Sequence, residues 1–297
     1  MLYEPMGPTG DRRIPTRFAV PGQSGFPLEM FYRFLRDLKS LRLTLGPQKR
    51  MSYSSFSATQ RAIRSLIGSR TRISYFMMKF APDLRTIIWK DPMAALAVPA
   101  VLTFGFPTVI CIRSPVAHAA SFKRQGWKVN VRPIYSAFRS VYGELPSVER
   151  ILSRETSLTS AKSASLMWNI IYAVAARAAR GEFGQTPGKL LMIGGKELEV
   201  NEVQVYRLLY SELGLAFEGR PHRLIEARAR SATDDVGDPK RTHNWQRSVA
   251  TTNTYWREVL DAEEIGFASE LNSRLYEELC GFIVNTRPPS TTVTSSV

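Results

Sequence analysis

The sequence has few residues of the kinds that bind metals or form disulfides. It contains two cysteines, Cys111 and Cys280, and three scattered histidines, His118, His222 and His243. No Cys-x-x-Cys pair and no zinc-ligand spacing occurs among them. We therefore expect no bound metal, and the low cysteine content indicates a reducing, cytoplasmic compartment.

Acidic residues are in short supply, because 26 Asp and Glu stand against 40 Lys and Arg, a formal net charge of +14. Such an excess favours an anionic partner: nucleic acid, an acidic membrane surface or a polyphosphorylated small molecule. The basic residues between positions 33 and 42 alternate with an apolar stripe at helical spacing, which we interpret as a solvated helix face. Since no aromatic-interleaved basic run or known binding module is present, we expect no nucleic-acid partner, and that alternative rests on charge alone.

Long apolar segments are also scarce. Residues 1–10 have no apolar core, so we expect no signal peptide. The longest stretch without a charge runs from Met93 to Ile112, twenty residues that could just span a bilayer. Pro99, Gly105 and Pro107 divide this stretch, so we expect a buried helix followed by a buried strand, and no membrane span.

The remaining pattern alternates short apolar strands with amphipathic helices. Strands are expected at 85–89, 108–112 and 189–193, and helices at 28–45, 57–67, 92–104, 116–125, 163–180, 201–213 and 258–279. Residues 1–27 and 220–247 are expected to be loops, and 286–297 a disordered tail. This order predicts one α/β domain over residues 1–285, with a parallel sheet flanked by helices.

Ligands of parallel sheets bind where strands run into helix N-termini, which here points to Lys90-Asp91-Pro92 and Arg113-Ser114-Pro115. Asp91 and Ser114 are typical N-cap residues, and each precedes a proline suited to the first helical position. An arginine beside exposed helix N–H groups can bind an anion. Ser121 lies eight residues beyond Arg113 and adds a hydroxyl. From the residues alone, an arginine that merely ends a strand and a serine on an ordinary helix are equally good interpretations.

The spacing Arg-x-Pro-x-x-x-x-x-Ser from Arg113 to Ser121 resembles the 3′-phosphate-binding motif of sulfotransferases that use 3′-phosphoadenosine 5′-phosphosulfate (PAPS). Other segments that resemble this family occur in the familiar order: Lys90-Asp91-Pro92, Gly126-Trp127, Trp168, Leu213–Leu215, Arg247-Ser248 and Trp256–Leu260. The similarity covers roughly residues 1–280. It implies a P-loop-NTPase-like fold and PAPS as the co-substrate, with adenosine 3′,5′-bisphosphate as product.

Two departures from the family pattern stand out. Nothing matches the strand, Ser-Gly-Thr-rich loop and helix that hold the 5′-phosphosulfate in the family, and Glu4-Pro5 resembles the segment that follows them. We therefore expect a fold that lacks the first strand–loop–helix unit, a truncated start, and weak or absent activity. In addition, Gly194–Leu198 stands where many members carry a Tyr-Glu-Asp-like run.

The resemblance implies a transfer of the sulfuryl group to a hydroxyl or amine of a small-molecule or glycan acceptor. Glu4 is the candidate base and Lys90 the candidate cation at the transferred group, while Arg113, Ser121, Arg247 and Ser248 are the candidate donor-binding residues. Glu4 could equally be a frayed terminal carboxylate and Lys90 a surface lysine. A non-catalytic remnant of the fold that binds a nucleotide or a partner is the alternative function.

Overall fold

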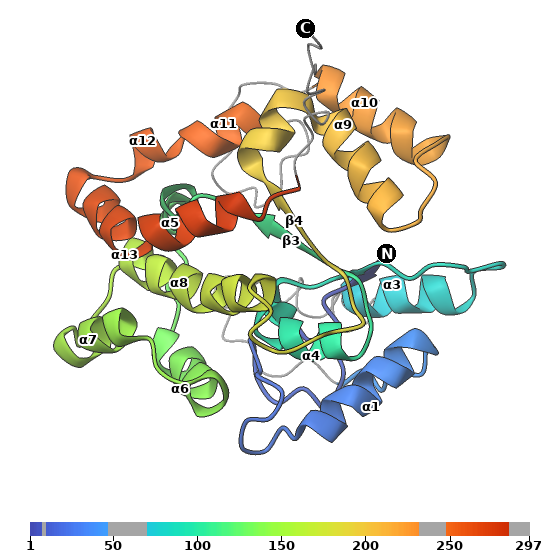
Figure 1. The fold of residues 1–297 in the computed structure, drawn as a ribbon, viewed down its shortest axis with the longest axis horizontal. Helices are drawn as coiled ribbons and strands as arrows, with labels where there is room; N and C mark the ends of the chain where they lie inside the picture. The colour runs from blue at the N-terminus through green and yellow to red at the C-terminus, as the bar shows by residue number, and fades with distance from the viewer. Residues whose placement is uncertain (8–9, 47–69, 232–247, 285–297) are drawn as a thin grey trace, which may run out of the picture. The chain divides into compact units, whose positions relative to one another are not determined.

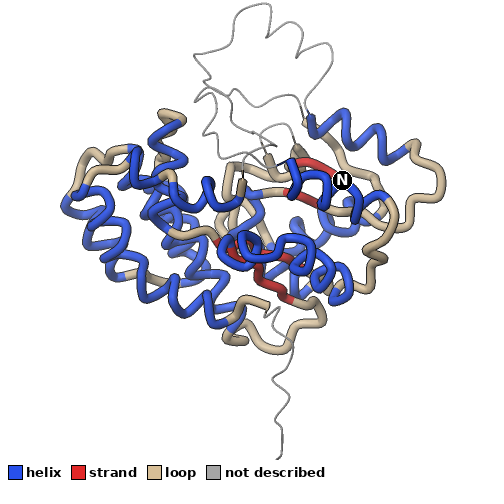
Figure 2. Tube along the Cα trace, turned by 90° about the horizontal axis from the view of Figure 1, so that it is seen from above, coloured by secondary structure: helices blue, strands red, loops and turns tan. Residues whose placement is uncertain are grey.

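The computed structural model describes residues 1–7, 10–46, 70–231 and 248–284. The expected helix at 57–67, the candidate Arg247 and the expected tail at 286–297 therefore lie outside the described residues. Helices dominate the described chain, and the strands are few and short (Figures 1 and 2). The chain is thus mixed α/β, as the sequence predicts.

The chain divides into two compact units. The first contains Met1–Phe106, Asn130–Leu152 and Ile170–Lys189, and the second contains Pro107–Val129, Ser153–Asn169 and Leu190–Val297. The single domain expected over residues 1–285 stays a prediction.

The first unit is built around a short parallel pair of strands. Its elements are β1 (Leu2–Tyr3), α1 (Leu28–Lys39), α3 (Arg70–Lys79), β2 (Trp89–Lys90), η1 (Pro92–Ala97), α4 (Val98–Thr103), α6 (Val131–Tyr142) and most of α7 (Pro146–Arg154). The second half of α8 (Ser160–Ala179) also belongs to it. In the sheet, Leu2 lies opposite Trp89 and Tyr3 opposite Lys90.

The second unit contains the longer strand pair. Its elements are β3 (Thr108–Ile112), α5 (Pro115–Arg124), the first half of α8, β4 (Leu190–Gly194), α9 (Gly195–Glu212), α10 (Arg220–Ser231), α11 (Val249–Thr254), α12 (Trp256–Val259) and α13 (Ala262–Gly281). Strands β3 and β4 are parallel and in register from Thr108–Leu190 to Ile112–Gly194. The strands expected at 108–112 and 189–193 thus pair in parallel, whereas the strand expected at 85–89 is reduced to β2 at Trp89–Lys90. The described residues form two separate two-stranded sheets.

Several expected elements are confirmed closely. Strand β3 has the expected bounds. Helices α8 and α13 correspond to the helices expected at 163–180 and 258–279, and their ends differ from the expected ends by a few residues. The uncharged stretch Met93–Ile112 is split into the helical segments η1 and α4 and the strand β3, as its prolines predict. The strand is not buried as expected, because Ile112 is its only buried residue and Cys111 is exposed. No described helix has the length and apolar character needed to cross a membrane.

Three further expectations about local structure are wrong. Helix α1 stops at Lys39 rather than at residue 45, because Leu41 adopts a left-handed φ of 51° that a helix cannot accommodate. Residues 2–3 form a strand instead of loop. Residues 220–231 form a helix instead of loop, because α10 packs on α9 and Arg228 forms an ion pair with Glu202.

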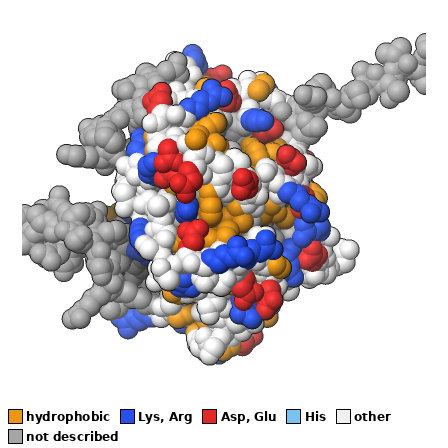
Figure 3. Space-filling view, turned by 90° about the vertical axis from the view of Figure 1, so that its left-hand side faces the viewer, with side chains coloured by type: hydrophobic (Ala, Val, Ile, Leu, Met, Phe, Trp, Pro, Cys, Tyr) orange, Lys and Arg blue, Asp and Glu red, His pale blue; other side chains and the backbone are white. Residues whose placement is uncertain are grey.

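Exposed basic and acidic side chains are interspersed on one face of the described residues. On the face drawn in Figure 3, Lys and Arg side chains alternate with Asp and Glu around exposed hydrophobic groups. Several exposed arginines pair with neighbouring carboxylates, among them Arg36 with Glu29 and Arg139 with Glu144. These pairs support the interpretation of much of the excess charge as solvated helix faces.

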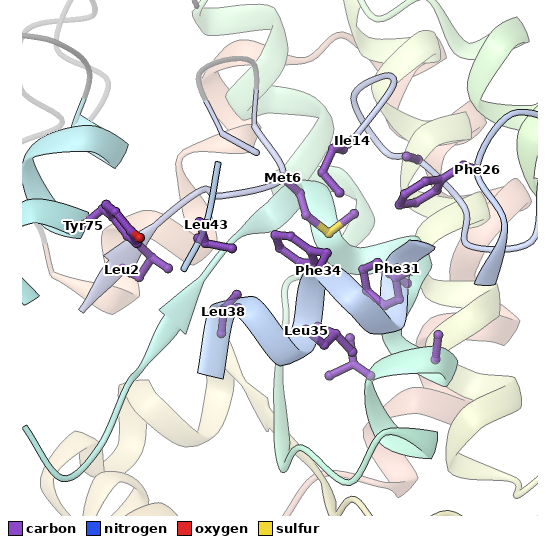
Figure 4. Close-up of a cluster of buried hydrophobic side chains, with 14 of the residues drawn as sticks. Leu2, Met6, Ile14, Phe26, Phe31, Phe34, Leu35, Leu38, Leu43 and Tyr75 are labelled. Carbon is purple, nitrogen blue, oxygen red and sulfur yellow. The ribbon is translucent and has the colours of Figure 1, made fainter. Parts of the chain in front are cut away.

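The apolar side of α1 forms the core of the first unit (Figure 4). Phe31, Phe34 and Leu35 are fully buried, and Leu38 is 3% exposed, as their helical spacing predicts. The rings of Phe31 and Phe34 are stacked with centroids 5.7 Å apart. Leu2 is also fully buried in this cluster, so the same core that holds α1 holds strand β1 in place.

Candidate anion-binding site

The turn between β3 and α5 is the centre of the candidate site in the second unit. Arg113 follows the last residue of β3 directly, and Pro115 begins α5. The Ser114 hydroxyl accepts a hydrogen bond from the Ala117 backbone N–H at 3.3 Å. The expected cap is therefore confirmed, and Arg113 stands at the start of a ten-residue helix.

Residues 252 and 255, at the end of α11, hold the Arg113 side chain. Its Nη2 donates to the Thr252 carbonyl at 3.1 Å and to the Tyr255 hydroxyl at 3.2 Å. The guanidinium carbon lies 5.7 Å from the centre of the Tyr255 ring. The Arg113 carbonyl accepts a hydrogen bond from Trp168 Nε1 at 2.9 Å, which connects the turn to α8. The two acceptors of the guanidinium, one backbone carbonyl and one hydroxyl, are neutral oxygens.

Two buried nitrogens of the site have no hydrogen-bond partner, Nε of Arg113 and Nε2 of His118. Burial, with the Arg113 charge as a second cause, lowers the pKa of His118 from 6.5 to about 3, so the imidazole is neutral near neutral pH. The His118 ring also packs on Phe122 with centroids 4.8 Å apart. An unpaired buried donor is costly, and an anion accepting from Arg113 Nε would remove that cost.

Ser121 lies about two turns into α5, and no described residue forms a hydrogen bond with its hydroxyl. No hydrogen bond links it to Arg113 either. Arg124 follows on the same helix face one turn later, and its guanidinium carbon lies 5.3 Å from the centre of the Tyr255 ring. Tyr255 thus contacts the guanidinium groups of both Arg113 and Arg124.

Sequence reasoning missed Arg124 and Tyr255. The spacing of three between Ser121 and Arg124 was a readable signal, because such residues share a helix face. Nothing in the sequence indicates that Tyr255 returns to α5, because that contact joins residues more than a hundred positions apart. The cluster of Tyr255, Leu260 and two alanines of α5 fixes this return by burying apolar side chains.

Ser248 is the N-cap of α11. Its hydroxyl accepts from the Thr251 backbone N–H at 3.0 Å and lies 2.8 Å from the Thr251 hydroxyl. The structure brings this helix to Arg113, because Thr252 on α11 supplies the carbonyl that Arg113 binds. The other residue of the expected pair, Arg247, lies outside the described residues.

Glu4 and Lys90 belong to the first unit and lie at the carboxyl ends of β1 and β2. The Glu4 backbone N–H donates to the Lys90 carbonyl at 2.8 Å. The Lys90 ammonium is exposed and lies 5.6 Å from the centre of the Tyr3 ring. Neither side chain forms an ion pair with a described residue, so the structure joins these two candidates through their backbones only.

Asp91, expected only as a helix cap, is the perturbed carboxyl group of this region. It caps η1 by accepting from the Met93 N–H at 3.0 Å and also accepts from the Met6 N–H at 2.6 Å. Burial raises its pKa from 3.8 to about 6, and hydrogen bonds from Met6, Trp89 and Met93 oppose that rise. The charge of Glu4 adds a smaller increase.

Gly194 ends β4 and Gly195 begins α9, and both glycines lie close to side chains of other residues. A Cβ at Gly195 would lie 2.6 Å from Asn253 Oδ1, and a Cβ at Gly194 would lie 2.3 Å from Glu197 Oε2. The Asn253 amide donates to the Gly195 carbonyl at 3.0 Å, which connects α11 to the start of α9. A larger side chain at Gly195 would require the Asn253 side chain, on the helix that contacts Arg113, to move.

Within the described ranges, no group of His, Cys, Asp and Glu residues is arranged to hold a metal ion. No family model, no curated protein and no solved structure matches this chain.

Proposed function

We propose that the chain is a PAPS-dependent sulfotransferase with a P-loop-NTPase-like fold, and that Arg113 and Ser121 bind the 3′-phosphate of PAPS. The observation that carries the proposal is the state of Arg113 at the start of α5. Among the described residues its guanidinium bonds only to neutral oxygens, and its buried Nε has no partner. A phosphate oxygen would satisfy that donor and pair with the charge.

The other candidates have roles in the same proposal. Ser248 and Arg247 close over the donor nucleotide, which fits the contact of the Ser248-capped helix with Arg113. PAPS supplies the sulfuryl group, and the acceptor is a hydroxyl or amine of a small molecule or glycan. Glu4 accepts the acceptor's proton and Lys90 offsets negative charge at the transferred group, because sulfuryl transfer relies on positioning and electrostatics as phosphoryl transfer does.

Calorimetric titration with adenosine 3′,5′-bisphosphate tests the nucleotide site, with adenosine 5′-monophosphate as the ligand that lacks the 3′-phosphate. The bisphosphate is expected to bind more tightly, and Arg113→Lys, which loses the planar donor fork, should weaken it by about tenfold or more. Ser121→Ala should weaken it less. Arg154→Lys, an exposed arginine on α7, is the control and should change nothing. Equal affinity for both nucleotides would refute the 3′-phosphate assignment.

A transfer assay with PAPS and a panel of phenols, amines and oligosaccharides tests catalysis separately. If Glu4 is the base, Glu4→Gln should lower the rate by about 10²–10⁴ while bisphosphate binding stays unchanged. Bisphosphate binding without transfer to any acceptor would favour the alternative, a non-catalytic protein that binds a nucleotide or a partner. If the chain neither prefers the bisphosphate nor transfers a sulfuryl group to any acceptor, the sulfotransferase proposal is wrong.

A further inference from the structure

An exposed apolar stripe runs along α3 in the first unit. Ile73, Phe76, Met77 and Phe80 are 42%, 54%, 71% and 75% exposed, and their spacing places them on one helix face. The opposite face carries Thr71, Tyr75 and Met78, which are buried in the unit. The exposed stripe is therefore not the side that attaches α3 to the protein.

Two further exposed hydrophobic side chains follow α3 in the sequence, Leu84 and Ile88, which are 39% and 43% exposed. Six of the thirteen exposed large hydrophobic side chains in the described chain thus fall between positions 73 and 88. Isolated exposed hydrophobic residues are normal on a protein surface, but a group of large side chains that share one helix face, as on α3, is typical of an interaction site.

Basic residues accompany the apolar stripe. Residues 70–90 contain five basic side chains and one acidic side chain, Asp83, and α3 itself has no acidic residue. Arg70 and Lys79 are both exposed and stand on either side of the stripe. A partner for this surface must accept large apolar groups and carry negative charge.

A basic groove lies beside the stripe. It is an open cavity of about 540 Å³ between α3 and the turn after α1, lined by Ser40, Leu41, Arg42, Leu43, Tyr75 and Lys79. Arg42 and Lys79 give it two cationic groups, and Lys79 also borders the stripe. A groove with this lining can take the phosphate of a lipid headgroup while the stripe enters the acyl boundary.

We propose that α3 and the segment to Ile88 bind in the plane of an anionic membrane surface. Helix α3 has ten residues, which is too short to span a bilayer, so the association is interfacial. Nucleic acid fits the surface less well, because it has no apolar interior in which exposed aliphatic side chains could be buried. A second copy of this basic chain would bring like charges together.

Vesicle co-sedimentation of the full chain tests the proposal, using phosphatidylcholine vesicles with and without added phosphatidylserine. We expect binding only to the anionic vesicles, and weaker binding as salt rises. Phe76→Ser combined with Phe80→Ser should reduce binding by about tenfold or more. The control combines Val200→Ser with Leu224→Ser, because those side chains are 86% and 59% exposed in the second unit, and it should bind normally.

A charge variant provides a second measurement. Arg70→Glu combined with Lys79→Glu should lower vesicle binding more than Arg154→Glu with Arg274→Glu, which changes the net charge equally at exposed sites elsewhere. The proposal would be overturned if both double variants lose vesicle binding equally, or if the wild-type chain does not bind vesicles. The proposal would also be overturned if the chain does not bind vesicles but self-associates or binds RNA, and if Phe76→Ser with Phe80→Ser abolishes that self-association or RNA binding. Unchanged melting temperatures of the variants show that they are folded.

Discussion

At the scale of single residues, Asp91 joins two segments of the first unit through one carboxylate. One oxygen accepts from the Met93 N–H and the other from the Met6 N–H. The first bond is local and follows from an Asp-Pro at a helix start, whereas the second joins residues 85 positions apart. The burial that accompanies the second bond raises the pKa of Asp91.

The raised pKa predicts a pH dependence of stability. Because the pKa of Asp91 is about 6 in the folded chain against 3.8 as its ordinary value, folding favours the protonated form. This contribution is fully present below pH 3.8 and is lost as pH rises through 6, and it amounts to about 3 kcal/mol. Asp91→Asn cannot titrate, so its free energy of unfolding should fall less than that of the wild type over this range.

Urea unfolding of both chains across that pH range measures the difference. Asp83→Asn, which alters an exposed aspartate, is the control and should follow the wild-type curve. Asparagine also loses one acceptor, so a constant offset of about 1 kcal/mol is expected. Parallel curves for Asp91→Asn and the wild type would contradict the prediction.

At the scale of elements, a buried pair of asparagines connects α8 to α13 in the second unit. The Asn169 amide donates to Asn272 Oδ1 at 3.0 Å, and the Asn272 amide donates to the Ser165 carbonyl at 3.3 Å. Asn272 is fully buried, so these bonds have no competition from water. At the start of α13, Asp261 and Glu264 form a capping box, which fixes where the helix begins.

Loss of one asparagine should destabilise the second unit strongly. Asn272→Leu leaves the Asn169 amide and the Ser165 carbonyl without this partner, at a cost of about 2–4 kcal/mol. The double variant with Asn169→Leu should cost less than the sum of the single variants, because it removes both polar partners. Chemical unfolding of all three variants measures this coupling, with the exposed Glu270→Ala as a control on the same helix. Strict additivity would show that the two side chains do not interact.

At the scale of the whole molecule, the net charge of +14 is a source of repulsion within the chain. Exposed ion pairs such as Arg36–Glu29 offset it little, because such pairs contribute less than about 1 kcal/mol each. Long-range repulsion among 40 basic residues should therefore outweigh them at low ionic strength.

We consequently expect the melting temperature to rise as sodium chloride is increased from low concentration to about 0.15 M, where the screening length is about 8 Å. Differential scanning calorimetry at fixed pH measures the shift, and an uncharged solute of equal osmolality is the control. A fall in melting temperature would show instead that the ion pairs dominate.

The predictable part of this fold is the part set by neighbours in the chain. The strand at Thr108–Ile112 and the caps at Asp91 and Ser114 were predicted correctly. An apolar β-branched run favours a strand, and an Asp or Ser before a proline favours a helix start, through interactions between residues that are close in the sequence. Helix α10 was missed because its sequence is polar, and packing on α9 stabilises it. Strand β1 was missed because two residues carry no pattern.

The candidate site divides in the same way. The sequence alone predicted Arg113 at the end of a strand and Ser121 on the following helix. It also provided the family resemblance that links these residues to a 3′-phosphate, and the binding of that phosphate stays a prediction. Only the tertiary structure brought Tyr255 and Thr252 to Arg113 and left the arginine Nε buried without a partner. The reason is physical: local propensities choose the elements, whereas burial of apolar side chains from distant segments decides which polar groups meet.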